Sequence, residues 1–413
     1  MSATARDRFG PLHERDFRLL FAGRVVSGLG SAIAPVGLAF AILDLTGSKS
    51  DLGLVLAARQ IPAVIFMLFG GVISDRLPRN RVMVGSDVVC AASQGIVAAL
   101  LLSGNATVWA LAVLAGVNGA SIAFFFPASQ GVLPQVVSLP RRQSAIALLR
   151  LGLNATSIIG PALGGVLVAA TNPGWALAVD AATFLLGAIF VAAMNLPQTV
   201  RIAGSRMLSE LHEGWREFRA RTWLWVIVIQ FAVVNAAFSG IALVIGPVQA
   251  DAHLGGAGPY GLIVAATSGG FVCSGVVMLR WRPSRMLLIA TFTVLVEAVP
   301  TALWAFPAPV AALMAASFLA GCGVEIFGVL WETTMQQQIR GYMLSRLYAY
   351  DMLGSIALMP LGLAVVGPIA DAVGVGATCL GAAALIVLAT LPVFAVRDVR
   401  ELRRTSAAVD AAA

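Results

Sequence analysis

Long stretches with few or no charges recur from Phe17 almost to Arg397, and they restrict the possible folds more than any other feature of the sequence. A helix needs roughly 20 apolar residues to cross the hydrocarbon core of a bilayer. The chain is 59% hydrophobic and only 11% charged, whereas a soluble domain carries roughly 25% charged residues. The sequence therefore predicts an all-α polytopic membrane protein.

Hydropathy and the positions of Gly, Pro and Arg predict twelve transmembrane helices, arranged as two pseudo-symmetric six-helix bundles around a central cavity. The predicted spans are 17–43, 51–73, 82–102, 107–130, 144–170, 175–195, 223–250, 257–279, 284–305, 308–336, 344–370 and 374–396. The predicted domains are an N-terminal bundle over 1–196, a cytoplasmic linker over 197–222, and a C-terminal bundle with a cytoplasmic tail over 223–413. Leu208, Leu211, Trp215 and Phe218 have helical spacing, which predicts an amphipathic surface helix in the linker.

The basic residues predict the orientation of the chain. Of the 27 Lys and Arg residues, 23 lie in, or within three residues of, the N-terminal tail and every second connection, and the other connections hold only Lys49. The positive-inside rule then places both termini in the cytoplasm of a multi-pass protein of the inner membrane. This distribution also accounts for the net charge of +7 without a nucleic-acid partner.

Part of the second-to-third connection recurs 204 positions later, in the eighth-to-ninth connection. The matching residues are Gly71 with Gly275, Arg76 with Arg280, and Arg81 with Arg285. Secondary transporters are commonly built from repeats whose interface holds the substrate. The repeat therefore indicates a transporter.

The second-to-third connection reads GGVISDRLPRNR from Gly70 to Arg81. This sequence resembles the loop signature between helices two and three of the major facilitator superfamily, and the resemblance covers essentially the whole chain. In that family the loop stabilises the outward-facing state. The resemblance implies a gating role for Gly71, Asp75, Arg76, Arg79 and Arg81. A loop whose charges only set the topology is the alternative.

The fifth span reads TSIIGPALGG from Thr156 to Gly165. It is similar to the antiporter signature of exporters in the same superfamily, with Thr156 in place of the first glycine. Gly160, Gly164 and Gly165 allow close approach of another helix, and Pro161 removes a backbone hydrogen bond. The motif favours export, although close packing alone would need the same residues.

Further segments resemble one exporter branch, which includes enterobactin exporters and macrolide-efflux proteins. They are DAATF at 180–184, with Trp331, Thr334, Gln337, Arg346 and Asp351. The resemblance implies efflux of a drug, antibiotic or siderophore-like molecule by proton antiport. We further expect the proton gradient as energy source, no cofactor, and a monomer in the bilayer. A proton-coupled importer or uniporter is the alternative, because a fold does not set direction.

Ionisable residues inside spans are costly and are usually functional. Glu325 and Glu332 are the first proton-coupling candidates and Asp351 is the next, because a carboxylate in a partly dry cavity can take up and release protons. Pairing of Glu332 with Arg340 or Arg346 is the structural alternative. Asp180 and Arg59 are expected to form a structural ion pair, and Glu297 has no assigned role.

The substrate-cavity candidates combine sparse polar groups with aromatic rings, as in small-molecule pockets. They are Arg24, Asn118, Phe124, Phe125, Arg150, Asn154, Gln230, Asn235, Phe238 and Trp331. For Arg24, snorkelling toward the cytoplasm or pairing with an acid is the favoured interpretation.

Enzymatic and metal chemistry have no support in the sequence. His13, His212 and His253 lie in tails or loops, and the four cysteines lie in apolar segments without paired spacing. Neither a nucleophile with its base nor a phosphate-binding loop is recognisable. We therefore expect no catalytic residues and no metal site.

Overall fold

The structure is a computed structural model that describes residues 10–138, 141–195, 207–339 and 341–402. Within these ranges, twelve helices or helical segments are long and apolar enough to cross a membrane. This finding confirms the predicted all-α polytopic fold with twelve membrane-spanning helices. Each predicted span coincides with one of them to within a few residues.

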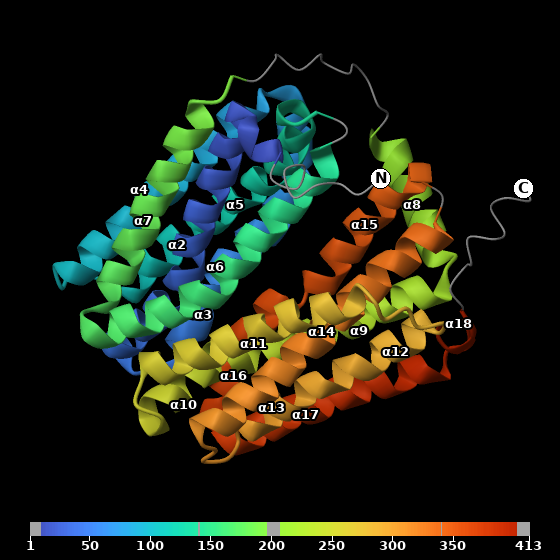
Figure 1. The fold of residues 1–413 in the computed structure, drawn as a ribbon. Helices are drawn as coiled ribbons and strands as arrows, with labels where there is room; N and C mark the ends of the chain where they lie inside the picture. The colour runs from blue at the N-terminus through green and yellow to red at the C-terminus, as the bar shows by residue number, and fades with distance from the viewer. Residues whose placement is uncertain (1–9, 139–140, 196–206, 340, 403–413) are drawn as a thin grey trace, which may run out of the picture. The chain divides into compact units, whose positions relative to one another are not determined.

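The first six spans are regular helices that pack side by side (Figure 1). Together with a short 3₁₀ helix they are η1 (Gly10–His13), α2 (Arg15–Thr46), α3 (Lys49–Arg76), α4 (Arg79–Leu102), α5 (Val108–Val136), α6 (Arg142–Ala170) and α7 (Pro173–Ala192). Helix α2 packs against α6 and α7, α3 packs against α5, and α4 lies against both α5 and α7. This arrangement buries one face of α4 between two neighbours.

The second half is more segmented. Its elements are α8 (Met207–Arg219), α9 (Thr222–Gly240), η3 (Ile241–Ile245), α10 (Gly246–His253), α11 (Ala257–Met278), α12 (Met286–Val294), η4 (Leu295–Glu297), α13 (Ala298–Leu303), α14 (Val310–Gln338), α15 (Gly341–Ile356), α16 (Met359–Val373), α17 (Val375–Thr390), η5 (Leu391–Ala395) and α18 (Arg397–Glu401). Helix α8 is the helix predicted in the linker, and it packs against α15.

Prolines interrupt three spans of the second half. A π-helical turn, η3, precedes Pro247, a 3₁₀ turn, η4, precedes Pro300, and the break between α15 and α16 precedes Pro360. Proline lacks a backbone N–H and crowds the preceding turn, which favours an irregular turn at these three positions, whereas α2, α3 and α6 continue through Pro35, Pro62 and Pro161. The predicted spans 223–250, 284–305 and 344–370 are therefore each built from consecutive segments.

Contacts between Cα atoms divide the chain into two compact units. The first unit comprises residues 1–203 with 250–265, and the second comprises residues 204–249 with 266–413. The beginning of α11 thus belongs to the first unit. The domain boundaries predicted at residues 196 and 223 remain predictions.

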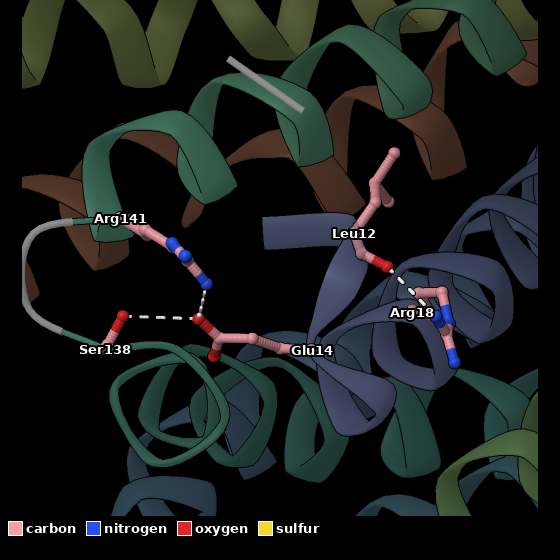
Figure 2. Close-up of polar contacts among 5 residues, drawn as sticks. All are labelled: Leu12, Glu14, Arg18, Ser138 and Arg141. Carbon is pink, nitrogen blue, oxygen red and sulfur yellow. Dashed lines mark hydrogen bonds and ion pairs between the residues drawn. The ribbon is translucent and has the colours of Figure 1, made fainter. Parts of the chain in front are cut away.

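At one end of the first unit, Glu14 ties the start of α2 to the α5–α6 connection (Figure 2). Its Oε1 accepts hydrogen bonds from Ser138 Oγ and from Arg141 Nη1, both at 3.2 Å. Below this contact, Phe17, Leu20 and Met83 are fully buried and join one hydrophobic cluster. The polar contact and the cluster hold the ends of α2, α4, α5 and α6 together.

Candidate functional site

The first unit encloses a polar cluster because α2 and α7 approach each other closely. Gly23, Gly30 and Gly37 recur every seven residues along α2, and each faces α7. A Cβ atom on Gly30 would overlap the Thr183 side chain and approach Asp180. The close approach leaves the Asp180 side chain only 1% exposed.

Two hydrogen-bonded pairs form this cluster. Gln94 Nε2 on α4 donates to Asp180 Oδ2 at 2.6 Å, and Arg59 Nε on α3 donates to Asn118 Oδ1 on α5 at 3.2 Å. A cavity of about 10 Å³, large enough for about one water molecule, is lined by Arg59, Gln94 and Asn118.

In this structure Arg59 and Asp180, the expected ion pair, each have another hydrogen-bond partner, and their pairing stays a prediction. The amide of Gln94 occupies one carboxylate oxygen, while Asn118 holds the Arg59 guanidinium on another helix. Asn118 is itself only 1% exposed. In this conformation it is a partner of Arg59 inside the helix bundle, although the sequence places it among the cavity candidates.

Asp87 on α4 is a buried acid that the sequence analysis missed. Its side chain is 2% exposed, and its charge interacts with that of Arg24 on α2. The interpretation of Arg24 as a snorkelling or paired residue stays a prediction. Asp87 and Gln94 lie seven residues apart on one face of α4, and that spacing is the signal that could have revealed both.

The glycine-rich motif of α6 makes close helix contacts within the first unit. Gly160 faces Ala32 and Gly164 faces Ile33, both on α2. On α11, the Ala257 carbonyl faces Gly165, and Gly261 faces the Pro161 carbonyl. The motif therefore joins α6 to two neighbouring helices through small residues, as close packing requires.

Asp351 is the centre of the polar contacts in the second unit. Its Oδ2 accepts a hydrogen bond from Trp331 Nε1 at 2.9 Å, and its Oδ1 accepts one from Ser355 Oγ at 3.4 Å. Asn235 Nδ2 on α9 donates to the Ser355 carbonyl at 3.0 Å. Three residues selected from the sequence, Trp331, Asp351 and Asn235, thus link α14, α15 and α9.

Aromatic rings hold Trp331 in place. It stacks on Phe327 with ring centroids 5.9 Å apart, and it meets Trp223 edge-on at 5.4 Å. Phe231 packs on Phe327 at 4.1 Å. Phe231 and Phe327 were not selected from the sequence, since an aromatic residue in an apolar helix carries no specific signal. The indole that donates to Asp351 is therefore fixed on both sides.

The two glutamates of α14 have different surroundings. Glu325 is half-buried and lies beside Gly275 of α11. Glu332 is exposed, and its Oε1 accepts a hydrogen bond from Gln336 Nε2 at 3.3 Å. Arg340 and the side chain of Arg346, its predicted alternative partners, lie outside the described residues.

The other candidates are distributed over several helices. Gln230 is 2% exposed and donates to Thr390 Oγ1 at 3.0 Å, between α9 and α17. Arg150 and Asn154 are exposed on α6. Phe124 packs on Phe66, with centroids 5.7 Å apart, Phe125 packs on the cluster around Phe17, and Phe238 packs on the cluster of the second unit.

Of the predicted gate, Arg79 is half-buried and Arg81 is exposed at the start of α4. Gly71, Asp75 and Arg76 lie outside the residues whose side chains are described. Glu297, in η4, is 3% exposed, and its Oε1 has no hydrogen-bond partner among the described residues. The described part of the chain holds no group of three or more His, Cys, Asp or Glu residues suited to a metal ion.

The amino-acid sequence was compared with models of protein families and with characterised proteins. The family model described as Major Facilitator Superfamily matches residues 19–356. The multidrug efflux pump Tap of Mycolicibacterium fortuitum is 26% identical over 403 residues, which cover 93% of this chain and 96% of that protein. Macrolide efflux protein A of Streptococcus pyogenes is 20% identical, covering 94% of this chain and 97% of the relative.

Solved structures show the same fold. The nucleoside transporter NupG superposes with a TM-score of 0.72 at 12% identity, covering 92% of this chain and 98% of that chain. A bacterial homolog of the human lysosomal transporter Spinster gives a TM-score of 0.71 at 13% identity, covering 95% and 99%. Because the family match spans most of the sequence and twelve apolar helices accompany it, this chain belongs to the major facilitator superfamily and is a multi-pass membrane transporter.

Proposed function

We propose that this transporter exports a small amphiphilic molecule, such as a drug, an antibiotic or a siderophore-like compound, in exchange for protons. The observation that carries the proposal is the similarity, over more than nine-tenths of the chain, to two proteins named as efflux proteins. The small residues of α6, which match the exporter motif, support the same direction. No observation favours import.

Asp351 is the residue to which we assign proton coupling, with Glu325 as the second candidate. The hydrogen bonds to Asp351 come from the neutral groups of Trp331 and Ser355. A proton can therefore neutralise the carboxylate without leaving a buried cation unpaired. Protonation would also change the contact between α14 and α15, and a ligand or proton shifts a conformational equilibrium only through such a differential contact.

For the gate, the orientation, the energy source and the working unit, we keep the roles that the sequence predicts. Arg79 and Arg81, with Gly71, Asp75 and Arg76, form the gate on the cytoplasmic side. Both termini lie in the cytoplasm and the protein resides in the inner membrane, as its basic connections favour. The proton gradient is the only energy source, and a single chain is the working unit.

Uptake into inside-out membrane vesicles tests the direction of transport. We would use radiolabelled erythromycin and the dye Hoechst 33342 as probes, energise the vesicles to an acidic interior, and compare them with vesicles lacking the protein. We expect accumulation that nigericin abolishes. Accumulation in right-side-out vesicles alone, or accumulation that ignores the pH gradient, would support an importer or a uniporter instead.

A further inference from the structure

A long apolar groove runs along the second unit and is not used by the proposed transport site. Its first part, of about 730 Å³, lies between α8, α9 and α15. Its second part, of about 480 Å³, lies between α9, α16 and α17. Leu358 lines both parts, so the two parts adjoin at this residue.

The second part of the groove lies in membrane-spanning helices. Leu361, Ile369 and Leu385 line it, and their side chains are 57%, 45% and 46% exposed. Along α16, the lining of this part extends from Leu358 to Val373, which at 1.5 Å per residue is roughly 22 Å of helix. This length suits an extended hydrocarbon chain better than a compact drug.

The first part of the groove has the character of a membrane–water interface. Trp215, Phe218 and Tyr350 form an aromatic cluster with ring centroids 5.6 to 5.8 Å apart, and Trp225 lines the groove beside them. Trp and Tyr gather at the level of the lipid head groups. This end of the groove is therefore suited to a polar head.

Arg219, the last residue of α8, gives this end a positive charge. It lines the groove, is exposed, and forms no ion pair within the described part of the chain. The neighbouring Arg221, in contrast, is paired with Glu217 at 2.6 Å. A basic residue at the membrane surface attracts anionic lipid head groups.

We propose that the groove binds an anionic phospholipid of the cytoplasmic leaflet. One acyl chain lies along α9, α16 and α17, and the phosphate pairs with Arg219 beside the aromatic cluster. The ligand combines the two features that the groove recognises, a long apolar chain and an anionic head. This site does not depend on the direction or the energy source of transport.

Native mass spectrometry of the full-length protein tests this site. Detergent-purified protein would be mixed with equal amounts of phosphatidylglycerol and phosphatidylcholine that carry identical acyl chains. We expect the wild type to retain more phosphatidylglycerol. Arg219→Gln should lower the ratio of the two bound lipids about fivefold, because it removes the ion pair with the phosphate, and one exposed ion pair contributes up to about that much. Arg216→Gln, on the same helix but outside the groove lining, should leave the ratio unchanged.

A second variant tests the apolar part of the groove. Gly381 lines the groove, and a Cβ atom there would meet nothing within 4 Å. Gly381→Leu therefore partly fills the groove without a clash, and it should reduce the retention of both lipids several-fold. Gly85→Leu on α4, where the space is equally open, is the matched control.

Three outcomes would overturn the proposal. One is an equal lipid ratio in the Arg219→Gln and Arg216→Gln proteins. Another is unchanged lipid retention in Gly381→Leu together with loss of bound Hoechst 33342, which would make the groove a drug site. The third is a dimer in the wild type that Gly381→Leu dissociates without affecting lipid, which would assign the groove to a second copy of the chain.

Discussion

Asp180 and Asp351 are each held by a neutral donor from another helix, one in each unit of the protein. Gln94 donates to Asp180 and Trp331 donates to Asp351. Removing the partner of a buried polar group lowers the free energy of unfolding by more than the hydrogen bond itself contributes. The reason is that the group stays desolvated without a compensating hydrogen bond. At the residue scale, these donors should therefore matter for both stability and transport.

Replacement of Gln94 by Leu should destabilise the first unit. The substitution removes the donor to a carboxylate that is 1% exposed, and we expect the free energy of unfolding to fall by about 2 kcal/mol. Thermal unfolding in detergent measures the effect. Gln336→Leu removes a comparable bond to Glu332 at an exposed site and should change the unfolding temperature little. Equal shifts for both variants would contradict the argument.

Replacement of Trp331 by Phe should impair transport while keeping the ring packing on Phe327. The variant loses only the indole N–H that donates to Asp351, and a hydrogen bond to a charged group contributes about 1.5 to 3 kcal/mol. We expect initial rates of proton-driven Hoechst 33342 uptake to fall about tenfold. Trp223→Phe changes a ring in the same aromatic group and should have a much smaller effect. An unchanged rate in Trp331→Phe would remove this hydrogen bond from the mechanism.

At the scale of elements, the two units use different local chemistry. The first unit has regular helices that approach through small residues, as α2 and α7 do along Gly23, Gly30 and Gly37. In the second unit three spans are divided into segments, and Pro247, Pro300 and Pro360 lie at the starts of the segments that follow the breaks, α10, α13 and α16. In segmented spans, some backbone N–H and C=O groups do not form the regular helical hydrogen bonds. Such groups are tolerated in membranes where other parts of the protein cover them or where they line a cavity.

Replacement of Gly30 by Val should separate α2 from α7. The added side chain would overlap Thr183 and Asp180, and overpacking of this kind costs about 1 to 3 kcal/mol in the free energy of unfolding. The yield of monodisperse protein and its unfolding temperature should both fall. Gly85→Val on α4 introduces the same side chain where a Cβ atom meets nothing within 4 Å. If both variants behaved alike, the close contact between α2 and α7 would not limit stability.

At the scale of the whole molecule, the sequence predicts the helices well because the bilayer imposes their length and hydropathy. Even the linker helix α8 was expected from the spacing of Trp215 and Phe218. The partners of buried side chains were harder to predict. Hydropathy does not specify which helix faces which, so Asn118 was not recognised as the partner of Arg59, nor Gln94 as that of Asp180.

Asp87 and Glu297 also show that hydropathy does not reveal which side chains are buried. Both are acids inside predicted spans, but only packing reveals that their side chains are 2% and 3% exposed. Conversely, the contact between Trp331 and Asp351 joins two residues that resemblance to one exporter branch had already selected. Motif resemblance selected two residues that are in contact, which hydropathy could not do.

Proton movement that accompanies transport by reconstituted protein tests the assignment of proton coupling to Asp351. Proteoliposomes loaded with a pH-sensitive dye would receive Hoechst 33342, for the wild type, Asp351→Asn, and Glu401→Gln, which alters an exposed acid outside the spans. We predict proton counterflow for the wild type and for Glu401→Gln, and its loss in Asp351→Asn with Hoechst 33342 binding retained. Wild-type counterflow in Asp351→Asn would contradict the assignment of proton coupling to this carboxylate.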